Sequence, residues 1–420
     1  MASKKLVTIA VMSVFFIAMG IGTITPAIQS IAEAFPEIGF STILLVSTLP
    51  SLFIIPSTYI AGMVVGTKVG YRPLLIAGVL LFSLAGAAPY ILTSSFAIIL
   101  VTRALFGIGL GVIMPLGNAL ILSLYEGQER ANMLGLSGVV MNLGGIALQL
   151  LGGILAAIKW NYAFLAHLLG IISLIMVLFM LPEPEKKAEQ VDEKIVIPGS
   201  VYLVSILFGI AMMVNYPLLV NMSTIIITDN LGDAASAGVV LSMFTVGGMI
   251  AGAIFGKVYQ LVTRFTISFG LLALAIGSGI VHYANNLMVL TVGTTIVGIG
   301  FGTLMPAVMM ILGSLVAPNA FAAASGILMA FMNLGGFMST YYIAMLAGIN
   351  NAVRFPIFVA MGLYGISSIV YMHYSRPKVH LLFPQNPKCF ILFSKILKHL
   401  TIRKLSDILK LDMYIQRCLH

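Results

Sequence analysis

The sequence predicts an all-α membrane protein with twelve transmembrane helices in two homologous six-helix halves. Of the 420 residues, 60% are hydrophobic and only 8% are charged, whereas roughly a quarter of the residues in a soluble domain are charged. Apolar runs long enough to cross a bilayer, which takes about 20 residues, recur from Leu6 to Tyr374. Patterns in the first half also return in the second at a constant offset. These observations exclude soluble enzymes, disordered chains and disulfide scaffolds.

The apolar runs define the expected spans in order. The first run, Leu6 to Ile28, is longer than the apolar core of a signal peptide and lacks a small-residue cleavage motif, so we expect a retained span. Polar residues, Gly and Pro end the runs. Six end near Ser30, Gly66, Ser94, Tyr125, Lys159 and Pro182, and six more near Thr228, Gln260, Asn285, Gly313, Gly348 and Tyr374.

The expected domain organisation follows from these spans and from one charged segment. Residues 182–198 carry eight charges and form the expected cytoplasmic linker. It separates an N-terminal six-helix half, residues 1–181, from a C-terminal half, residues 199–375. A basic cytoplasmic tail, residues 376–420, completes the chain.

The distribution of Lys and Arg predicts the orientation, because cytoplasmic loops carry the excess of positive charge. With both termini cytoplasmic, 19 of the 22 Lys and Arg residues fall on the cytoplasmic side, and only Arg103, Lys159 and Arg354 do not. An odd number of spans would remove this asymmetry. We therefore predict a multi-pass protein of the bacterial cytoplasmic membrane with both termini inside.

The net charge of +9 is concentrated in the tail, which holds nine Lys or Arg and two Asp. Because the body is nearly neutral, we expect the lipid bilayer and no nucleic acid as its partner. The tail suits an amphipathic helix on the anionic inner leaflet, or alternatively a weakly ordered segment with no role in transport. Cys389 and Cys418, the only cysteines, also lie there, so no disulfide is expected in the body.

An internal repeat relates the two halves. The segment from Arg103 to Pro115, RALFGIGLGVIMP, returns as TTIVGIGFGTLMP at residues 294–306, and Met-Asn-Leu-Gly-Gly at residues 141–145 returns at 332–336. Pro26 and Pro217 have the same spacing, so all three matches share an offset of 191 residues. This agreement indicates two homologous halves of six spans.

On these residues, the chain resembles the major facilitator superfamily over residues 6 to 375. The fourth-span pattern of that family, an Arg followed by closely spaced glycines and a proline, matches Arg103, Gly107, Gly109, Gly111 and Pro115. The resemblance implies a central cavity between the halves, which opens alternately to the two sides of the membrane.

Two further family patterns are met only in part. In the loop between spans two and three, Lys68, Gly70, Tyr71 and Arg72 match, but Thr67 stands where the family has an aspartate. In the fifth-span pattern associated with antiporters, Gly144, Gly152 and Gly153 match, whereas Leu148 and Gln149 replace a Gly-Pro pair. A latch built on the loop aspartate is therefore not expected, and the support for export is reduced.

Arg103 is the expected intramembrane charge. At 100° per residue it shares an arc of about 80° with Gly107, Gly111 and Asn118. Because a buried Arg costs roughly 2.5 to 3.5 kcal/mol on insertion scales, we expect it to face the cavity or a partner; the alternative is snorkelling to the outer interface. A cavity with this fixed charge would favour neutral or weakly acidic compounds over cations.

The remaining candidate residues are polar side chains within spans. Asn142 and Gln149 share a face of span five, and Asn333 and Thr340 repeat them in the other half. The candidates for substrate or coupling are Arg103, Asn118, Asn142, Gln149, Asn215, Asn333 and Thr340, and those for conformational change are Lys68, Gly70, Arg72, Gly107, Gly111 and Pro115. The glycines alternatively serve close helix packing, and His167 and Asn215 alternatively are satisfied core residues.

No carboxylate falls in a span interior, so a proton as coupling ion would need His167, or Glu33 or Asp229 near the outer mouth. No phosphate-binding G-x-x-x-x-G-K-[ST] motif occurs, which leaves ATP-driven pumping without support, and no cofactor or metal is expected. The sequence favours a secondary transporter, rather than an enzyme, that exports small lipophilic compounds. The alternatives are uptake of a small metabolite such as a sugar, amino acid or organic anion, and a membrane sensor that transports nothing.

The orientation is tested by cysteine labelling in intact cells, after removal of Cys389 and Cys418. Because Ser95 falls in an outer loop and Gln190 in the cytoplasmic linker, Ser95→Cys should react with an impermeant thiol reagent and Gln190→Cys should not. Labelling of Gln190→Cys in sealed cells would reverse the orientation.

Overall fold

The computed structural model describes residues 4–65, 68–183, 196–262, 265–317 and 320–374. Twelve helical spans lie in these ranges, which confirms the predicted number and the all-α fold class. The predicted tail, both cysteines, Thr67, Gln190 and most of the linker fall outside the described residues. Within them, the only extended pairing is an isolated bridge between Val65 and Val69.

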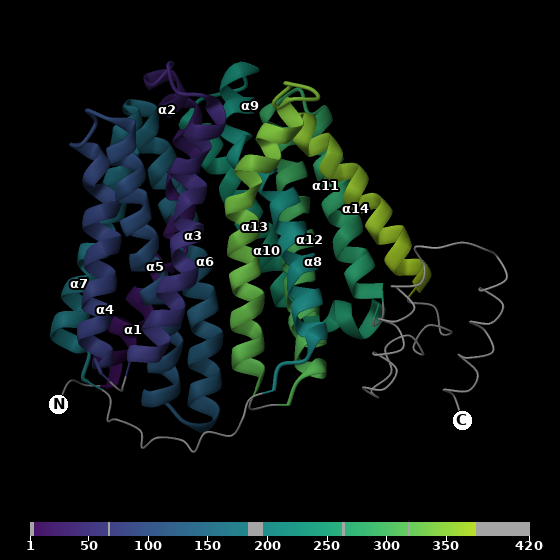
Figure 1. Cartoon of the computed structure of the whole chain (residues 1–420). Coiled ribbons are helices and arrows are strands. Elements are labelled where there is room, and N and C mark those ends of the chain that lie inside the picture. The colour runs from purple at the N-terminus through teal and green to yellow at the C-terminus, as the bar shows by residue number, and fades with distance from the viewer. Residues whose placement is uncertain (1–3, 66–67, 184–195, 263–264, 318–319, 375–420) are drawn as a thin grey trace, which may run out of the picture. The chain divides into compact units, whose positions relative to one another are not determined.

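The chain forms the following elements (Figure 1). The first half contains α1 (Lys4–Ala18), η1 (Gly20–Ala27), α2 (Ile28–Ala34), α3 (Phe40–Val64), α4 (Tyr71–Leu80), η2 (Leu81–Ala85), η3 (Ala88–Tyr90), α5 (Phe96–Leu124), α6 (Gly127–Ile158), η4 (Trp160–Leu168) and α7 (Leu169–Met180). The second half contains α8 (Gly199–Val220), α9 (Met222–Thr228), α10 (Ala234–Val262), α11 (Thr266–Tyr283), α12 (Leu287–Leu315), α13 (Phe321–Ala347) and α14 (Phe355–Tyr374). By compactness, the described residues up to Ser368 form one unit.

The first span of each half is interrupted near a proline. In the first half, α1 passes into the 3₁₀ helix η1, which contains Pro26, and then into α2. In the second half, α8 contains Pro217 and ends at Val220, and α9 begins after Asn221. Proline removes a backbone donor and crowds the preceding turn, so a helix tends to break close to it. The 191-residue repeat seen in the sequence therefore recurs as a repeated helix break.

The closely spaced glycines of α5 and α12 pack two neighbouring helices. A Cβ on Gly107 would lie 2.5 Å from the Pro50 carbonyl oxygen of α3, and one on Gly109 would lie 2.8 Å from that of Gly78 in α4. Their repeat partners do the same: Gly298 lies against the backbone of α10, and a Cβ on Gly300 would lie 2.8 Å from the Gly270 oxygen of α11. Small residues thus let the backbones approach closely, which is how helices pack without a hydrophobic driving force between them.

Buried apolar side chains form three clusters. One lies among helices of the first half and includes Phe15, Phe82 and Phe106. Another lies among helices of the second half, around Phe208 and Leu271. The third joins the halves, since it combines residues of η1, α2, α3, α5, α6 and η4 with Val220, Ala234 and Ile343 of the second half. The two bundles therefore share a common core over part of their length.

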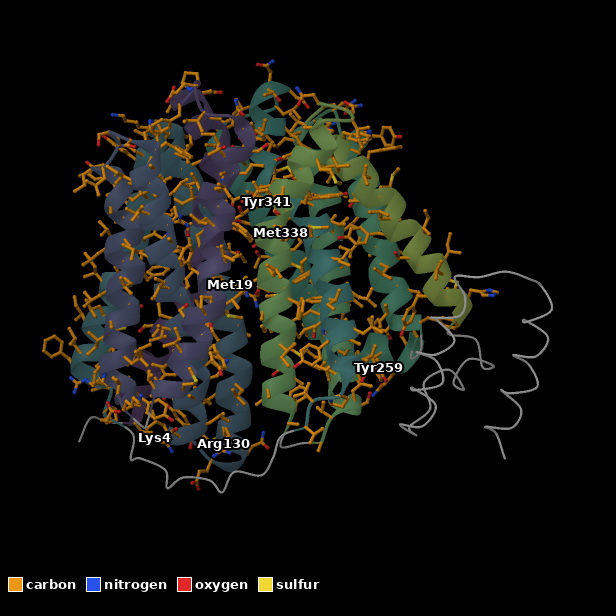
Figure 2. All side chains as sticks on the ribbon, in the orientation of Figure 1. Lys4, Met19, Arg130, Tyr259, Met338 and Tyr341 are labelled. Atoms are coloured by element: carbon orange, nitrogen blue, oxygen red, sulfur yellow. The ribbon has the colours of Figure 1, made fainter. Side chains whose placement is uncertain are left out.

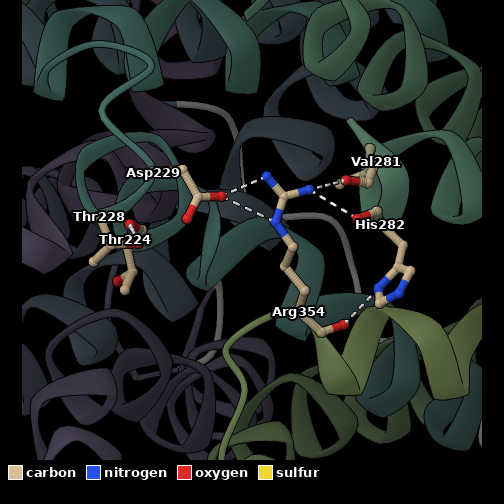
Figure 3. A network of polar contacts seen from close by, with 6 residues as sticks. All are labelled: Thr224, Thr228, Asp229, Val281, His282 and Arg354. Atoms are coloured by element: carbon tan, nitrogen blue, oxygen red, sulfur yellow. Dashed lines mark hydrogen bonds and ion pairs between the residues drawn. The ribbon is translucent and has the colours of Figure 1, made fainter. Parts of the chain in front are cut away.

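Two ion pairs identify the two ends of the bundle. Lys4 Nζ and Glu129 Oε2 lie 2.6 Å apart and join the starts of α1 and α6; we call this the Lys4 end, and Figure 2 shows Lys4 and Arg130 together there. At the opposite end, Arg354 Nη2 and Asp229 Oδ2 lie 2.6 Å apart. Arg354 also donates to the carbonyl oxygens of Val281 and His282 at the end of α11 (Figure 3). We call this the Asp229 end.

The start of α10 at the Asp229 end is fixed by a side-chain cap. Asp233 Oδ1 accepts hydrogen bonds from the Ser236 backbone nitrogen and hydroxyl, both at 2.9 Å. These bonds stabilise the carboxylate and lower the pKa of Asp233. The cap places Ala234 and Gly238 at the surface where the two halves meet.

Candidate functional site

The two halves touch through glycine backbones near the Asp229 end. A Cβ on Gly153 of α6 would lie 2.6 Å from the Ala234 oxygen and 3.1 Å from the Gly238 Cα of α10, and one on Gly238 would lie 2.9 Å from the Gln149 oxygen. Nothing larger than hydrogen fits at either position without movement of the backbone. The contact between α6 and α10 therefore depends on these two glycines.

Hydrogen bonds cross between the halves at the same end. The hydroxyls of Thr48 in α3 and Thr340 in α13 lie 2.7 Å apart, and both residues are buried. Ser223 Oγ of α9 donates to the Pro26 carbonyl oxygen of η1 at 2.6 Å and accepts from the Gln29 backbone nitrogen at 3.4 Å. Together with Gly153 and Gly238, these residues form what we call the inter-half contact. It closes the Asp229 end of the interface.

Toward the Lys4 end, no described residue packs on the open glycines of the same helix faces. Gly135 precedes Gly153 by 18 residues and Gly256 follows Gly238 by 18, which is five turns, or about 27 Å, along the same helix face. Nothing lies within 4 Å of a Cβ built at either Gly135 or Gly256. Gly62 of α3 and Gly326 of α13 are also open. The halves therefore separate toward the Lys4 end and leave a space between α3 and α6 on one side and α10 and α13 on the other.

Two predicted residues, Gln149 and Thr340, lie at the inter-half contact. Thr340 makes the hydrogen bond to Thr48. Gln149 is one turn from Gly153; its Nε2 would be 2.8 Å from a Cβ on Gly22, and its buried Oε1 has no partner among the described residues. Tyr216 of α8, the neighbour of Asn215 in the seventh span, packs its ring on Gly336 of α13 and lies beside Ser51 of α3.

Asn142 and Asn333 occupy equivalent places in the repeat. Asn142 Nδ2 donates to the Gly138 oxygen at 2.8 Å, and Asn333 Nδ2 donates to the Met329 oxygen at 2.9 Å. Both side chains are half-buried, and their amide oxygens take no part in these hydrogen bonds. They lie on the Lys4-end side of the contact, because Asn142 precedes Gln149 by about two turns of α6 and Asn333 precedes Thr340 by about two turns of α13.

The other predicted polar residues do not join this site. Asn215 is 2% exposed and its amide has no partner among the described residues. Asn118 is exposed, one turn beyond Pro115, through which α5 continues as a helix. Gly107 and Gly111 lie against α3. Glu33 and Asp229, considered as coupling carboxylates, are bound to Gln29 and Arg354.

Arg103 lies inside the first half rather than between the halves. It is 0% exposed, so it neither faces a cavity in this conformation nor reaches the membrane interface. Its Nε donates to the Val46 oxygen of α3 at 2.9 Å, and its Cζ lies 4.0 Å from the centroid of the Phe106 ring. The guanidinium is thus held by a carbonyl and a cation–π contact.

A carboxylate that was expected in the linker, that of Glu183, contacts the loop motif between the second and third spans. Glu183 accepts from the backbone nitrogens of Tyr71 at 2.5 Å and Arg72 at 2.9 Å, at the start of α4, and its carboxylate touches Gly70. Arg72 Nη2 donates to the Leu178 oxygen, while Lys68 is exposed. An acid at a helix N-terminus is stabilised by the unpaired N–H groups. In the sequence, the only indication of this contact was that Glu183 lies directly after the sixth span, on the same side of the membrane as the loop.

Three phenylalanine rings contact one another within the second half. The Phe301 ring of α12 lies 6.4 Å from that of Phe208 in α8 and 5.7 Å from that of Phe244 in α10. Met305 and Met309 continue along α12 as partly buried neighbours of the core. Aromatic and methionine side chains form adaptable apolar walls.

Fold and interface together define a multi-pass membrane transporter built from two repeats of six spans. The model of the Major Facilitator Superfamily matches residues 10–203 and 201–411, and the chain belongs to this superfamily. The predicted family is thereby confirmed, as is the expectation of a transporter rather than an enzyme.

Relatives of known name are distant. The chain is 22% identical over 372 residues to the quinolone resistance protein NorA of Staphylococcus aureus (strain MSSA476), a match that covers 86% of this chain and 94% of NorA. It is 26% identical over 178 residues to the multidrug transporter protein MdtP of Bacillus subtilis (strain 168), covering 41% and 31%. The solved nucleoside transporter NupG (D323A mutant) shares the fold, with a TM-score of 0.73, 9% identity, and coverage of 87% and 99%.

The glycine contact predicts an effect for one of two alanine substitutions on α6 and none for the other. Gly153→Ala should weaken the inter-half contact by about 1–3 kcal/mol, because its Cβ would overlap the Ala234 oxygen. A reporter Thr48→Cys, in a chain without Cys389 and Cys418, should then react faster with a thiol reagent. Gly138→Ala is the matched control, since nothing surrounds that position. Equal labelling rates in both variants would contradict the role of Gly153.

Proposed function

We propose that this chain is a secondary transporter that exports small lipophilic compounds by alternating access. One observation carries the proposal: the interface between the halves is closed by the inter-half contact at the Asp229 end and open at the Lys4 end. A transporter that alternates must be able to break such a contact and form another at the opposite end. A contact of one glycine pair and a few hydroxyls is small enough to be reversible.

The orientation predicted from charge assigns the open end to the cytoplasm. The Lys4 end contains Lys4, Lys68, Arg72 and Arg130, as the positive-inside rule requires of the cytoplasmic side. Substrate would then enter the space between the halves from the cytoplasm or the inner leaflet. Release would follow once the Asp229 end opens.

The chemistry of the interface supports a lipophilic substrate. In the described residues, Arg103 is the only charged side chain in the middle of a span, and it is fully buried. The other residues named near the interface are neutral: the amides of Asn142 and Asn333 and the hydroxyls of Ser51 and Tyr216. Such a surface selects by shape and apolar area. The names of NorA and MdtP, which refer to quinolones and to multiple drugs, agree with this substrate class.

The position of Arg103 changes the expected substrate charge. The sequence argument against cations required this guanidinium to face the cavity. Because Arg103 lies within the first half and is bound to Val46 and Phe106, its charge is not presented to the interface. We therefore propose lipophilic compounds without a restriction to neutral or acidic ones.

The function is tested with purified protein in proteoliposomes, with norfloxacin as a fluorescent quinolone. We expect norfloxacin exchange across the membrane and its accumulation under an imposed proton gradient. Empty liposomes provide the background. Absence of both activities, with a folded protein and with other lipophilic dyes tested in parallel, would favour the sensor interpretation.

A reversible cross-link tests whether opening of the Asp229 end is required. Thr48→Cys with Thr340→Cys replaces two hydroxyls that lie 2.7 Å apart, so oxidation should form a disulfide across the halves. Norfloxacin transport should fall to background and return after reduction. Each single cysteine variant is the control. Transport that continues at full rate in the cross-linked protein would contradict alternating access through this contact.

A further inference from the structure

A buried polar cluster in the first half has unpaired nitrogen atoms that the proposed transport path does not use. Arg103 and His167 are both 0% exposed. Arg103 Nη1 and Nη2 and His167 Nε2 have no hydrogen-bond partner among the described residues. Because buried polar groups in native structures are nearly always paired, three such atoms in one cluster require an explanation.

The hydrogen bonding of His167 defines which ring nitrogen is available. His167 Nδ1 lies 3.0 Å from the Phe164 carbonyl oxygen. Since a carbonyl only accepts, Nδ1 carries the hydrogen, and Nε2 of the neutral ring has a free lone pair. The Gly20 backbone of η1 lies close enough to receive a hydrogen bond from the protonated ring. The site can therefore hold a proton between His167 and η1.

Arg103 and His167 lie against the same aromatic ring. The imidazole lies edge-on to Phe106, with centroids 4.7 Å apart and planes at 79°, and Arg103 Cζ lies 4.0 Å from the same Phe106 centroid. A charge on His167 would therefore lie beside the same ring as the charge of Arg103, in buried surroundings. Because the dielectric constant is low in such surroundings, the repulsion between the two charges would be only weakly screened.

Among the residues that the structure describes, no other ionisable group compensates this pair. Around η4, the elements η1, η2 and α7 contain no ionisable side chain. Tyr90 of η3 pairs with the Tyr162 ring, and Glu33 of α2 is bound to Gln29. On α6, Glu129 is paired with Lys4 and Arg130 is bound to the Tyr125 oxygen. Arg103 is the charged side chain that shares the Phe106 ring with His167.

We propose that His167 carries the coupling proton of the exporter and that Arg103 is the positioning charge that expels this proton in the conformation described. This inference rests on the proposed function. In the opposite conformation the Nε2 lone pair binds a proton from the Asp229 side, and the imidazolium donates to the Gly20 oxygen. When the inter-half contact forms, Arg103 approaches, the N–H bond breaks, and the proton leaves toward the Lys4 side.

Arg103 and Gly20, the two residues proposed to act on the proton, are both connected to the inter-half contact. Arg103 holds the Val46 oxygen, and two residues further along α3, Thr48 bonds Thr340 of the other half. Gly20 belongs to η1, whose Pro26 oxygen accepts from Ser223 of α9. A proton on His167 that displaces Arg103 or η1 therefore acts directly on residues that close the Asp229 end.

Two assays in proteoliposomes separate this inference from the proposed function. Exchange of norfloxacin at equal pH on both sides needs no net proton movement, whereas accumulation under a pH gradient does. With a gradient of about one pH unit, coupling to one proton sustains at most about a tenfold concentration ratio, since one unit is worth a factor of ten. We expect wild type to show both activities, and His167→Gln to exchange norfloxacin but accumulate none.

His282→Gln is the matched control, because His282 also bonds a carbonyl oxygen but lies beside the Asp229–Arg354 pair. It should accumulate norfloxacin as wild type does. Accumulation by His167→Gln at the wild-type ratio would overturn the role of His167. A wild type that neither exchanges nor accumulates would instead refute the proposed function.

A second variant covers the case in which His167→Gln does not fold. Arg103→Gln removes the neighbouring charge and leaves His167, so proton release on norfloxacin binding should shift to higher pH, by about one unit or more. This release is measured with a pH-indicator dye and weakly buffered protein in detergent. An unchanged pH profile in Arg103→Gln would contradict the role of Arg103, and absence of any proton release by wild type would overturn the proposal as a whole.

Discussion

The backbone contact between Gly153 and Gly238 is the constraint on which the arrangement of the two halves depends. Lipid is as apolar as the helix surfaces, so the halves gain little by burying leucines and must meet by close packing and hydrogen bonds. Glycine at both positions brings the two helices to backbone distance. That approach in turn lets Thr48 reach Thr340 and Ser223 reach Pro26. The closed end of the interface, the open end and the proposed substrate path all follow from it.

Much of the fold could be predicted from the sequence because the bilayer limits the possibilities. Apolar length defines the spans, charge in the loops indicates their sides, and an offset of 191 residues reveals the two halves. The glycines of α5 and α12 were identified for the same reason, since helices in lipid pack through small residues. Their repeat partners Gly298 and Gly300 contact α10 and α11 as Gly107 and Gly109 contact α3 and α4.

The candidate site was less predictable. Residue spacing shows which side chains share a face of a helix, but it does not show which other helix that face contacts. Gln149 and Thr340 were selected as amide and hydroxyl on a polar face, and both lie at the inter-half contact. Arg103 was placed in the cavity by its charge, but a carbonyl of α3 and the Phe106 ring satisfy it inside one bundle. Glu183 was assigned to the linker because it belongs to a densely charged segment, and its contact with Tyr71 and Arg72 was missed because these lie more than a hundred residues away in the chain.

The central claim is that the interface closes at one end of the bundle while it is open at the other. Two distances between paired spin labels measure this directly in proteoliposomes: Gln128 with Ala322 across the Lys4 end, and Glu37 with Asn350 across the Asp229 end. Between protein without ligand at high pH and protein with norfloxacin at low pH, we expect the first distance to shorten and the second to lengthen. Two distances that change together in the same direction, or an Asp229-end distance that never lengthens, would contradict the account.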